Sequence, residues 1–178
     1  CKPEACGLFL TPSKPNKTMM TAARTNTKVL TQAFRLMATA KWMAQVYEEN
    51  FKFASKYVHA TSRGHEAIQL AAAFHLRPQD FVYPYYRDEA MLLGIGMRPY
   101  DLMLQLMAKR EDPFSGGRTY YVHPSLRDAD KPQIPHQSSA TGMQAIPATG
   151  AAMGLWYKAS HQMADWKPEE APIVLCSF

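Results

Sequence analysis

An uninterrupted apolar run near the end of the chain restricts the fold more than any other feature. The run is Ile173-Val174-Leu175-Cys176, and an apolar run without polar alternation is typical of a strand buried in a parallel sheet. Phe81-Val82-Tyr83 forms a second predicted strand, which Pro84 ends because proline cannot donate a backbone hydrogen bond. Helical patterns lie before and between these strands. The sequence therefore predicts an α/β fold with helices around a mostly parallel sheet.

Apolar side chains at three- and four-residue spacing predict five helices. They are expected over Lys28–Glu49, Gly64–His75, Asp88–Gly94, Pro99–Arg110 and Ala145–Met163. In the first helix the predicted buried face consists of Leu30, Ala33, Phe34, Met37, Ala40, Ala44 and Tyr47. The string Ala71-Ala72-Ala73 leaves room for a neighbouring element, and Gly150 and Gly154 give the last helix a small-residue face. Because glycine weakens a helix, this face predicts the close approach of another backbone.

The regular patterns stop between Glu111 and about Thr141, in a segment rich in proline and glycine. Irregular segments of this length are usually functional or disordered. Gly116-Gly117-Arg118 and Val122-His123 lie in it. A glycine pair lets a loop adopt unusual conformations, and histidine changes charge near neutral pH. The alternative is an ordinary loop histidine, and the histidines of the chain lack metal-ligand spacing.

The composition is that of one globular domain: 178 residues, 47% apolar and 20% charged. Three cysteines are too few and too scattered for a disulfide scaffold, which favours a reduced compartment. The longest uncharged apolar stretch, Ala145–Tyr157, is shorter than the roughly 20 residues that a spanning helix needs. The sequence therefore predicts no membrane segment.

Positive charge is concentrated near the start of the chain. Residues 1–41 carry seven basic side chains against one acidic side chain, whereas the remainder is nearly balanced. Residues 1–26 lack a periodic apolar pattern and are predicted to be a basic arm or linker; a transit peptide is an open alternative. A nucleic-acid binder would place its charge on a structured face, so this distribution disfavours nucleic acid.

The cluster Tyr85-Tyr86-Arg87-Asp88-Glu89 lies where a predicted strand ends and a helix begins. Ligand sites of open α/β sheets lie at such strand ends, and a guanidinium group presents a planar set of donors that fits phosphate oxygens. The alternative is an arginine paired with Asp88 or Glu89 on the surface. Spacing alone leaves both interpretations open.

A second cluster, Ser138-Ser139-Ala140-Thr141-Gly142-Met143-Gln144, precedes the small-residue helix. Hydroxyl groups and free backbone groups before a helix can hold a polar ring or a cation. The alternative is a capped helix start.

Taken together, these motifs form an ordered set. It comprises Arg63-Gly64-His65-Glu66-Ala67, Tyr86-Arg87-Asp88-Glu89-Ala90, Gly117-Arg118 with Val122-His123, and Ser138-Ser139 through Gln144 with Gly150-Ala151-Ala152. In order and spacing the set resembles the alpha subunit of the decarboxylating component of 2-oxo acid dehydrogenase complexes, the branched-chain type most closely. The resemblance covers residues 30–178. It implies the N-terminal part of a fold that binds thiamine diphosphate between an alpha and a beta part.

The resemblance also implies roles for individual residues. Arg87 would bind the diphosphate, with Tyr86 beside it. Ser139 and Thr141 match positions at the aminopyrimidine side of the cofactor. Ser138 and Gln144 match a structural potassium site, although Met143 replaces an expected hydroxyl ligand and a thioether suits a hard cation poorly.

Other family features are expected beyond Phe178, so we expect residues 27–178 to be the N-terminal portion of a cofactor-binding domain. These features are a Gly-Asp-Gly motif with the magnesium ligands and a proton-relay histidine, which leaves no catalytic residue assigned in this chain. The partners would be a beta subunit or fused beta half and a lipoyl acyltransferase, in a hetero- or homo-oligomer. We expect the fragment alone to be inactive.

The implied activity is oxidative decarboxylation of a 2-oxo acid with acyl transfer to a lipoyl group. A branched acid such as 3-methyl-2-oxobutanoate is favoured, and pyruvate or acetoin dehydrogenases of the same family are the alternative. An alternative of another class is a binding module in which the basic arm recruits nucleic acid or an acidic protein. A bacterial cytoplasm is the favoured location, with the mitochondrial matrix as the second.

Overall fold

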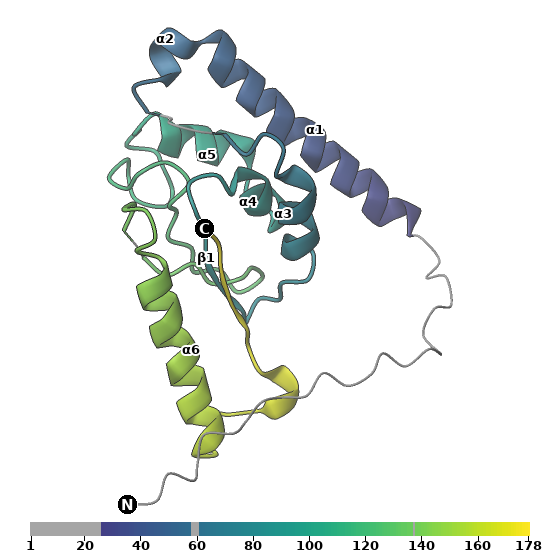
Figure 1. Cartoon of the computed structure of the whole chain (residues 1–178), viewed down its shortest axis with the longest axis vertical. Coiled ribbons are helices and arrows are strands. Elements are labelled where there is room, and N and C mark those ends of the chain that lie inside the picture. The colour runs from purple at the N-terminus through teal and green to yellow at the C-terminus, as the bar shows by residue number, and fades with distance from the viewer. Residues whose placement is uncertain (1–25, 58–60, 137) are drawn as a thin grey trace, which may run out of the picture.

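The computed structural model describes residues 26–57, 61–136 and 138–178. Its elements in chain order are α1 (Thr27–Glu49), α2 (Phe51–Ala54), α3 (Glu66–Ala73), β1 (Phe81–Tyr83), α4 (Glu89–Gly94), α5 (Pro99–Leu106), α6 (Ala145–Ser160), the 3-10 helix η2 (Pro168–Glu170) and β2 (Val174–Cys176) (Figure 1). Helices are thus combined with a small parallel sheet of two strands. Both predicted strands are confirmed.

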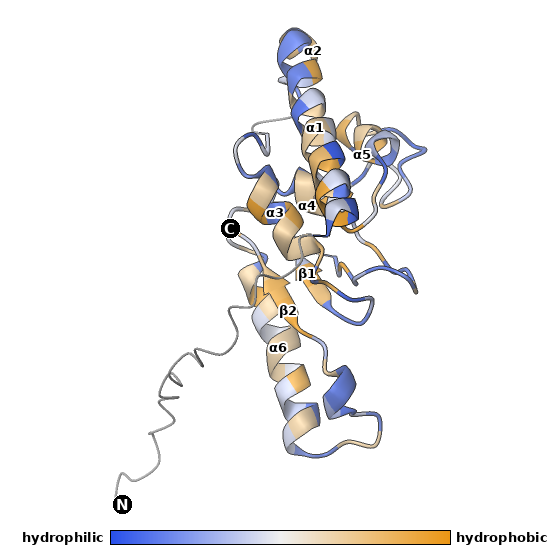
Figure 2. Ribbon diagram, turned by 90° about the vertical axis from the view of Figure 1, so that its right-hand side faces the viewer, coloured by the Kyte–Doolittle hydropathy of each residue, from blue (hydrophilic) through white to orange (hydrophobic). Residues whose placement is uncertain are grey.

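The two strands pair in parallel, with Val82 of β1 opposite Leu175 of β2. The pairing continues past the strand ends, because the Ser177 amide donates to the carbonyl of Tyr83 at 3.1 Å. On its other edge, β1 is covered by an irregular segment, and the Val82 amide donates to the carbonyl of Gln133 at 2.9 Å. Both strands consist of hydrophobic residues (Figure 2). β1 therefore lies inside the molecule, as its apolar sequence predicts.

Helix α1 begins at a side-chain cap, because the Asn26 side chain accepts a hydrogen bond from the Lys28 amide at 3.1 Å. Its C-terminal half packs against α3 and α4. The buried residues of this half are Ala40, Met43, Ala44 and Tyr47. α6 lies on the opposite side of the strands and packs against β1 and β2 (Figure 1).

The N-terminal half of α1 differs from the predicted buried face. Leu30, Phe34 and Met37 are 54%, 72% and 36% exposed. This half of α1 extends beyond α3 and α4, so its apolar side chains have no core to pack against in the described part of the chain. The predicted core role of Met37 is wrong for this part of the molecule.

Helices α3, α5 and α6 are shorter than the sequence patterns predict, and residues with positive φ lie beside their ends. Gly64, expected inside α3, has φ +89 and lies before the helix. Ala108 (φ 49) follows α5, and Gln162 (φ 46) follows α6. Such left-handed residues commonly terminate helices. In the described ranges, no helix combines the length and apolar character needed to cross a bilayer.

Helices α3 and α4 cross at a glycine. A Cβ atom at Gly94 would lie 2.6 Å from the Cβ of Ala73 and 3.0 Å from Cδ2 of Leu70. The alanine string of α3 therefore does admit a close neighbour, as predicted. By contrast, a Cβ atom at Gly150 or Gly154 of α6 would meet nothing within 4 Å in the described part of the chain.

We expect Gly94→Ala in the complete protein to lower the free energy of unfolding by about 1–3 kcal/mol, because the added methyl group overpacks the α3–α4 crossing. Gly150→Ala is the matched control. It adds the same methyl group to an open helix position and should not destabilise the protein. Urea unfolding of both variants measures the difference. Equal stability of Gly94→Ala and the wild type would contradict the described crossing.

Candidate functional site

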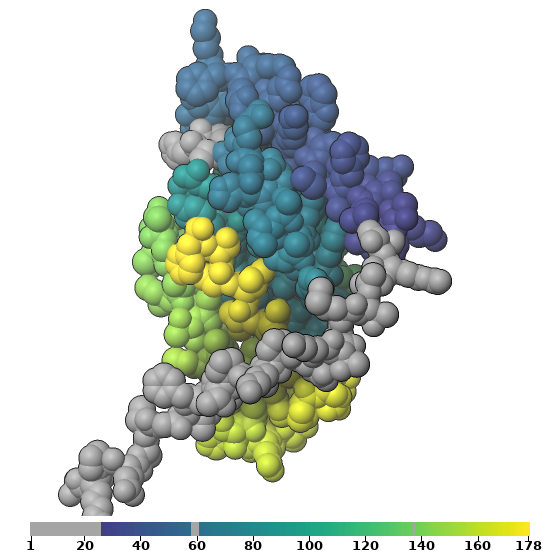
Figure 3. Space-filling model, turned by 45° about the vertical axis from the view of Figure 1, so that its right-hand side comes forward, coloured from purple at the N-terminus to yellow at the C-terminus, as the bar shows by residue number. Residues whose placement is uncertain are grey.

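The carboxyl ends of the two parallel strands meet at one edge of the sheet. After β1 the chain continues through Tyr85 and Arg87, and after β2 it continues through Ser177 and Phe178. These four residues, together with His65 of the α3 start, line a pocket of about 270 Å³. Figure 3 shows the end of the chain (yellow) at the surface beside teal residues. A loop after one strand and the end of the other thus form a site of the kind that α/β sheets use for ligands.

The loop that carries Arg87 is held by the buried side chain of Asp88. One carboxylate oxygen accepts the Tyr85 amide at 2.8 Å, and the other accepts Nε2 of Gln69 at 3.1 Å. The same Nε2 donates to the carbonyl of Arg87 at 2.9 Å. Burial raises the pKa of Asp88, and the hydrogen bond from Tyr85 opposes this effect. Asp88 and Gln69 together therefore fix the backbone of the Arg87 loop.

The guanidinium group of Arg87 lies 5.3 Å from the centre of the Tyr86 ring, and Nη2 donates to the Tyr86 hydroxyl at 3.4 Å. Hydrogen bonds from Tyr85 and then from Arg87 lower the pKa of Tyr86. Arg87 forms no ion pair with a carboxylate in the described ranges. The alternative of a surface pair with Asp88 or Glu89 is therefore wrong, since both carboxyl groups are buried and bonded elsewhere.

Residues 138–144, which we call the serine loop, lie beside the carboxyl ends of the strands through Thr141 and Gln144. Interaction with the Tyr86 side chain raises the pKa of Tyr85, and the nearby side chain of Thr141 opposes this effect. Gln144 is buried, and its Nε2 donates to the carbonyl of Ser177 at 2.7 Å. The two clusters singled out in the sequence are therefore connected in space.

Ser138 and Ser139 line a second pocket of about 540 Å³, with Tyr120, His123 and Met143 also in its wall. Both serines are exposed, so their hydroxyl groups can meet a ligand.

The potassium site assigned to Ser138 and Gln144 stays a prediction. The Ser138 hydroxyl is exposed and accepts the Ala140 amide at 3.2 Å, whereas Gln144 is buried and its amide nitrogen donates to the carbonyl of Ser177. In the described part of the chain, no three His, Cys, Asp or Glu side chains gather to hold a metal ion.

Asp112 holds a turn at the start of the irregular segment. Asp112 is buried, and its carboxylate accepts the Ser115 hydroxyl at 2.6 Å and the Gly117 amide at 3.1 Å. Gly117 has φ +75, and a Cβ atom there would lie 2.5 Å from the carbonyl oxygen of Ala108. Glycine is therefore required at this position, where the chain folds into a tight turn.

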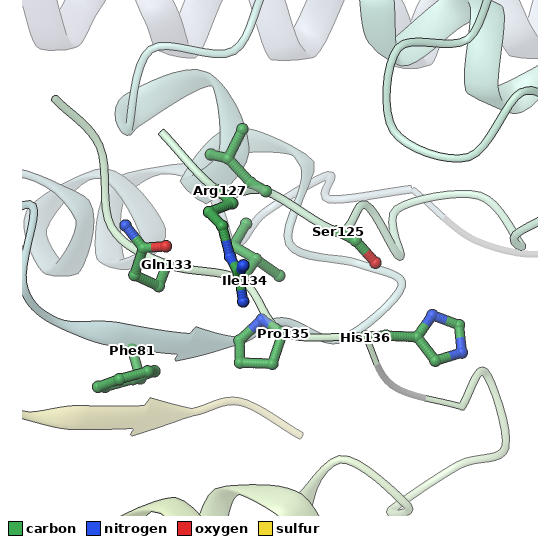
Figure 4. A pocket seen from close by; sticks show the side chains of 8 residues that line it. Phe81, Ser125, Arg127, Gln133, Ile134, Pro135 and His136 are labelled. Carbon is green, nitrogen blue, oxygen red and sulfur yellow. The ribbon is translucent and has the colours of Figure 1, made fainter. Parts of the chain in front are cut away.

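A further pocket, of about 240 Å³, lies at the opposite end of β1. Its lining includes Phe81, Arg127, Gln133, Pro135 and His136, and the His136 ring points away from the other side chains (Figure 4). Ligands of α/β sheets bind at the carboxyl ends of the strands. We therefore assign no ligand to this pocket.

Beneath the site lies a polar cluster that the sequence does not reveal. The hydroxyl of Tyr47 donates to Oε1 of Glu89 at 2.6 Å, and the hydroxyl of Tyr121 donates to the same oxygen. The three residues come from α1, α4 and the irregular segment. No local spacing could have predicted their contact.

Comparison with known proteins identifies the family. Residues 20–165 match the family model described as the dehydrogenase E1 component. The chain belongs to the E1 dehydrogenase component family. The resemblance stated from the ordered motifs is thereby confirmed.

Relatives within the E1 family support the branched-chain resemblance. The chain is 42% identical to the 2-oxoisovalerate dehydrogenase subunit alpha of Bacillus subtilis over 92 residues, which are 51% of this chain and 27% of that protein. It is 30% identical to the mitochondrial 2-oxoisovalerate dehydrogenase subunit alpha 2 of Arabidopsis thaliana over 96 residues, 54% of this chain and 20% of the relative. The chain thus aligns with about a quarter or less of the length of these relatives.

The buried carboxyl of Glu89 gives a pH test of the site. Burial is the main cause that raises its pKa above the ordinary value of 4.5. At a pH between the ordinary pKa of the unfolded chain and the raised pKa of the folded protein, unfolding therefore releases a proton. The contribution of Glu89 to stability is full below about pH 4.5 and falls as the pH rises. We expect Glu89→Gln in the complete protein to lose this part of the pH dependence of the free energy of unfolding.

Urea unfolding at several pH values between 4.5 and 8 checks this expectation, using Glu169→Gln in η2 as the exposed control, which should keep the wild-type slope. An unchanged slope in Glu89→Gln would show that Glu89 is not held in this buried environment.

Proposed function

We propose that this chain is the alpha part of a thiamine-diphosphate-dependent 2-oxo acid dehydrogenase and that it binds the diphosphate end of the cofactor. One observation carries the proposal. Arg87 stands at the carboxyl end of β1, in an E1-family chain, without a carboxylate partner in the described ranges. A cation without a counter-charge at the strand ends is suited to an anionic ligand.

The donor set fits this cofactor. Arg87 would form charge-assisted hydrogen bonds with the diphosphate, with Tyr86 beside it, and such bonds contribute about 1.5–3 kcal/mol each. Ser139 and Thr141 would meet the aminopyrimidine side, and the position of Thr141 near Tyr85 supports this arrangement. When bound, thiamine diphosphate supplies the electron sink for decarboxylation of a 2-oxo acid.

The residues of this chain contribute positioning and charge. Asp88 and Gln69 hold the Arg87 backbone before any ligand binds, which lowers the entropic cost of fixing the diphosphate. The aromatic ring of Tyr86 next to the guanidinium group restricts its orientation. The serine loop is tied to the end of β2 by Gln144, so the two binding regions keep a fixed separation.

The other parts of the enzyme follow from the family. We propose magnesium ligands in a Gly-Asp-Gly motif beyond Phe178, a beta subunit or fused beta half that completes the site, and a lipoyl acyltransferase that accepts the acyl group. The relatives named 2-oxoisovalerate dehydrogenase favour 3-methyl-2-oxobutanoate over pyruvate as the substrate. Potassium at Ser138 and Gln144 stays a prediction without structural support.

Domain and location assignments are also proposals. Residues 27–178 would form the N-terminal portion of the cofactor-binding domain. The basic arm of residues 1–26 lies outside the described residues except for Asn26, so its proposed role as a linker or binding module stays a prediction. The relatives include a bacterial and a mitochondrial protein, and we favour a bacterial cytoplasm.

We expect Arg87→Ala in the complete enzyme to weaken thiamine diphosphate binding by about tenfold or more, equivalent to about 1.4 kcal/mol. The physical reason is the loss of the cation that faces the strand ends. Fluorescence titration of the apoenzyme with the cofactor measures the dissociation constant.

Arg98→Ala is the matched control for this titration. Arg98 pairs with Asp101 at 2.7 Å at the start of α5 and does not line the Arg87 pocket. Its substitution should leave the cofactor affinity unchanged. Unchanged affinity in Arg87→Ala as well would refute the assignment of Arg87.

A further inference from the structure

His123 lies in the wall of the pocket that contains the two serines, and it is 3% exposed. Its Nδ1 lies 2.8 Å from the backbone carbonyl oxygen of Tyr121. Because a carbonyl group can only accept, Nδ1 must carry the hydrogen in this contact. Burial lowers the pKa of His123, which favours the neutral ring. A neutral ring of this tautomer leaves Nε2 as an acceptor.

The backbone between these two residues is strained. Val122 has φ 57 and is fully buried. A branched side chain in the left-handed region costs about 1–3 kcal/mol and persists only where the surroundings fix it. The residues on either side of Val122 must therefore be anchored.

Tyr121 provides such an anchor. Its hydroxyl donates to Oε1 of Glu89, and its ring packs edge-to-face against Tyr47 at 6.1 Å between centroids. Glu89 itself is 1% exposed and belongs to α4, which begins directly after the Arg87 loop. One buried carboxyl group thus connects the helix behind Arg87 with the segment that carries His123.

We infer that Glu89 and Tyr121 are positioning residues, which hold His123 so that its Nε2 faces a hydrogen-bond donor of the ligand bound in the serine pocket. The inference rests on the proposed function for the identity of that ligand, the aminopyrimidine end of thiamine diphosphate, whose amino group is a hydrogen-bond donor. The hydrogen bond between Tyr121 and Glu89 joins distant segments of the chain, and none of the sequence motifs indicates it. The alternative is that the cluster contributes to packing alone.

A double-mutant cycle on the complete enzyme separates the two roles. Tyr121→Phe keeps the ring but removes the anchoring hydroxyl. We expect it to lower kcat/KM by about fivefold or more when His123 is present and by less than twofold when it is combined with His123→Gln. A loss of the same factor in both backgrounds would assign the cluster to packing and overturn the inference.

Tyr47→Phe is the matched control for this cycle. It removes the other hydroxyl donor from the same Glu89 oxygen, but it leaves in place the Tyr121 hydroxyl and the Tyr121 backbone carbonyl that His123 contacts. It should lower stability without changing kcat/KM by more than about twofold. Glu89→Gln keeps an oxygen acceptor for Tyr121 and should retain kcat/KM, whereas Glu89→Ala should reproduce the effect of Tyr121→Phe.

Crystal structures of the complete protein test the anchor independently of activity. In Tyr121→Phe we expect the His123 ring to leave its 2.8 Å contact with the carbonyl group of residue 121. An unmoved ring would overturn the inference even if the proposed enzyme activity is absent. Absent activity in the wild-type enzyme would instead refute the proposed function, so the two failures are distinguishable.

Discussion

The parallel pairing of β1 and β2 is the constraint on which the rest of the structure depends. It brings together the ends of two segments that are about ninety residues apart, as in the register of Val82 with Leu175. Parallel strands have their carboxyl ends at the same edge, so the loop after β1 and the residues after β2 become neighbours. The Arg87 pocket lies between these neighbouring segments. Gln144 then connects the serine loop with the end of β2 through its hydrogen bond to Ser177.

The two carboxyl groups that follow Arg87 in the sequence form hydrogen bonds within the protein. Asp88 holds the Tyr85 amide and Gln69, and Glu89 holds two phenol groups. Neither carboxyl group neutralises Arg87, although both follow it directly in the sequence. Among the described residues, the positive charge at the strand end therefore has no carboxylate partner, which suits the anionic ligand that we propose.

The sequence predicts the features that depend on local chemistry. The end of β1 at Pro84 and the close neighbour of the alanine string both appear in the structure. Features that join distant segments could not be predicted, such as the contact of Tyr47 with Glu89, because side-chain spacing carries no information about them. The apolar pattern of α1 also gave no sign that Phe34 would be exposed, since periodicity identifies a face but not what covers it.

A crystal structure of the complete protein with thiamine diphosphate would test the central claim most directly. The account predicts the Arg87 guanidinium group within hydrogen-bonding distance of the diphosphate oxygens, with Ser139 and Thr141 beside the aminopyrimidine ring. A diphosphate bound elsewhere, with Arg87 turned away from it, would contradict the account.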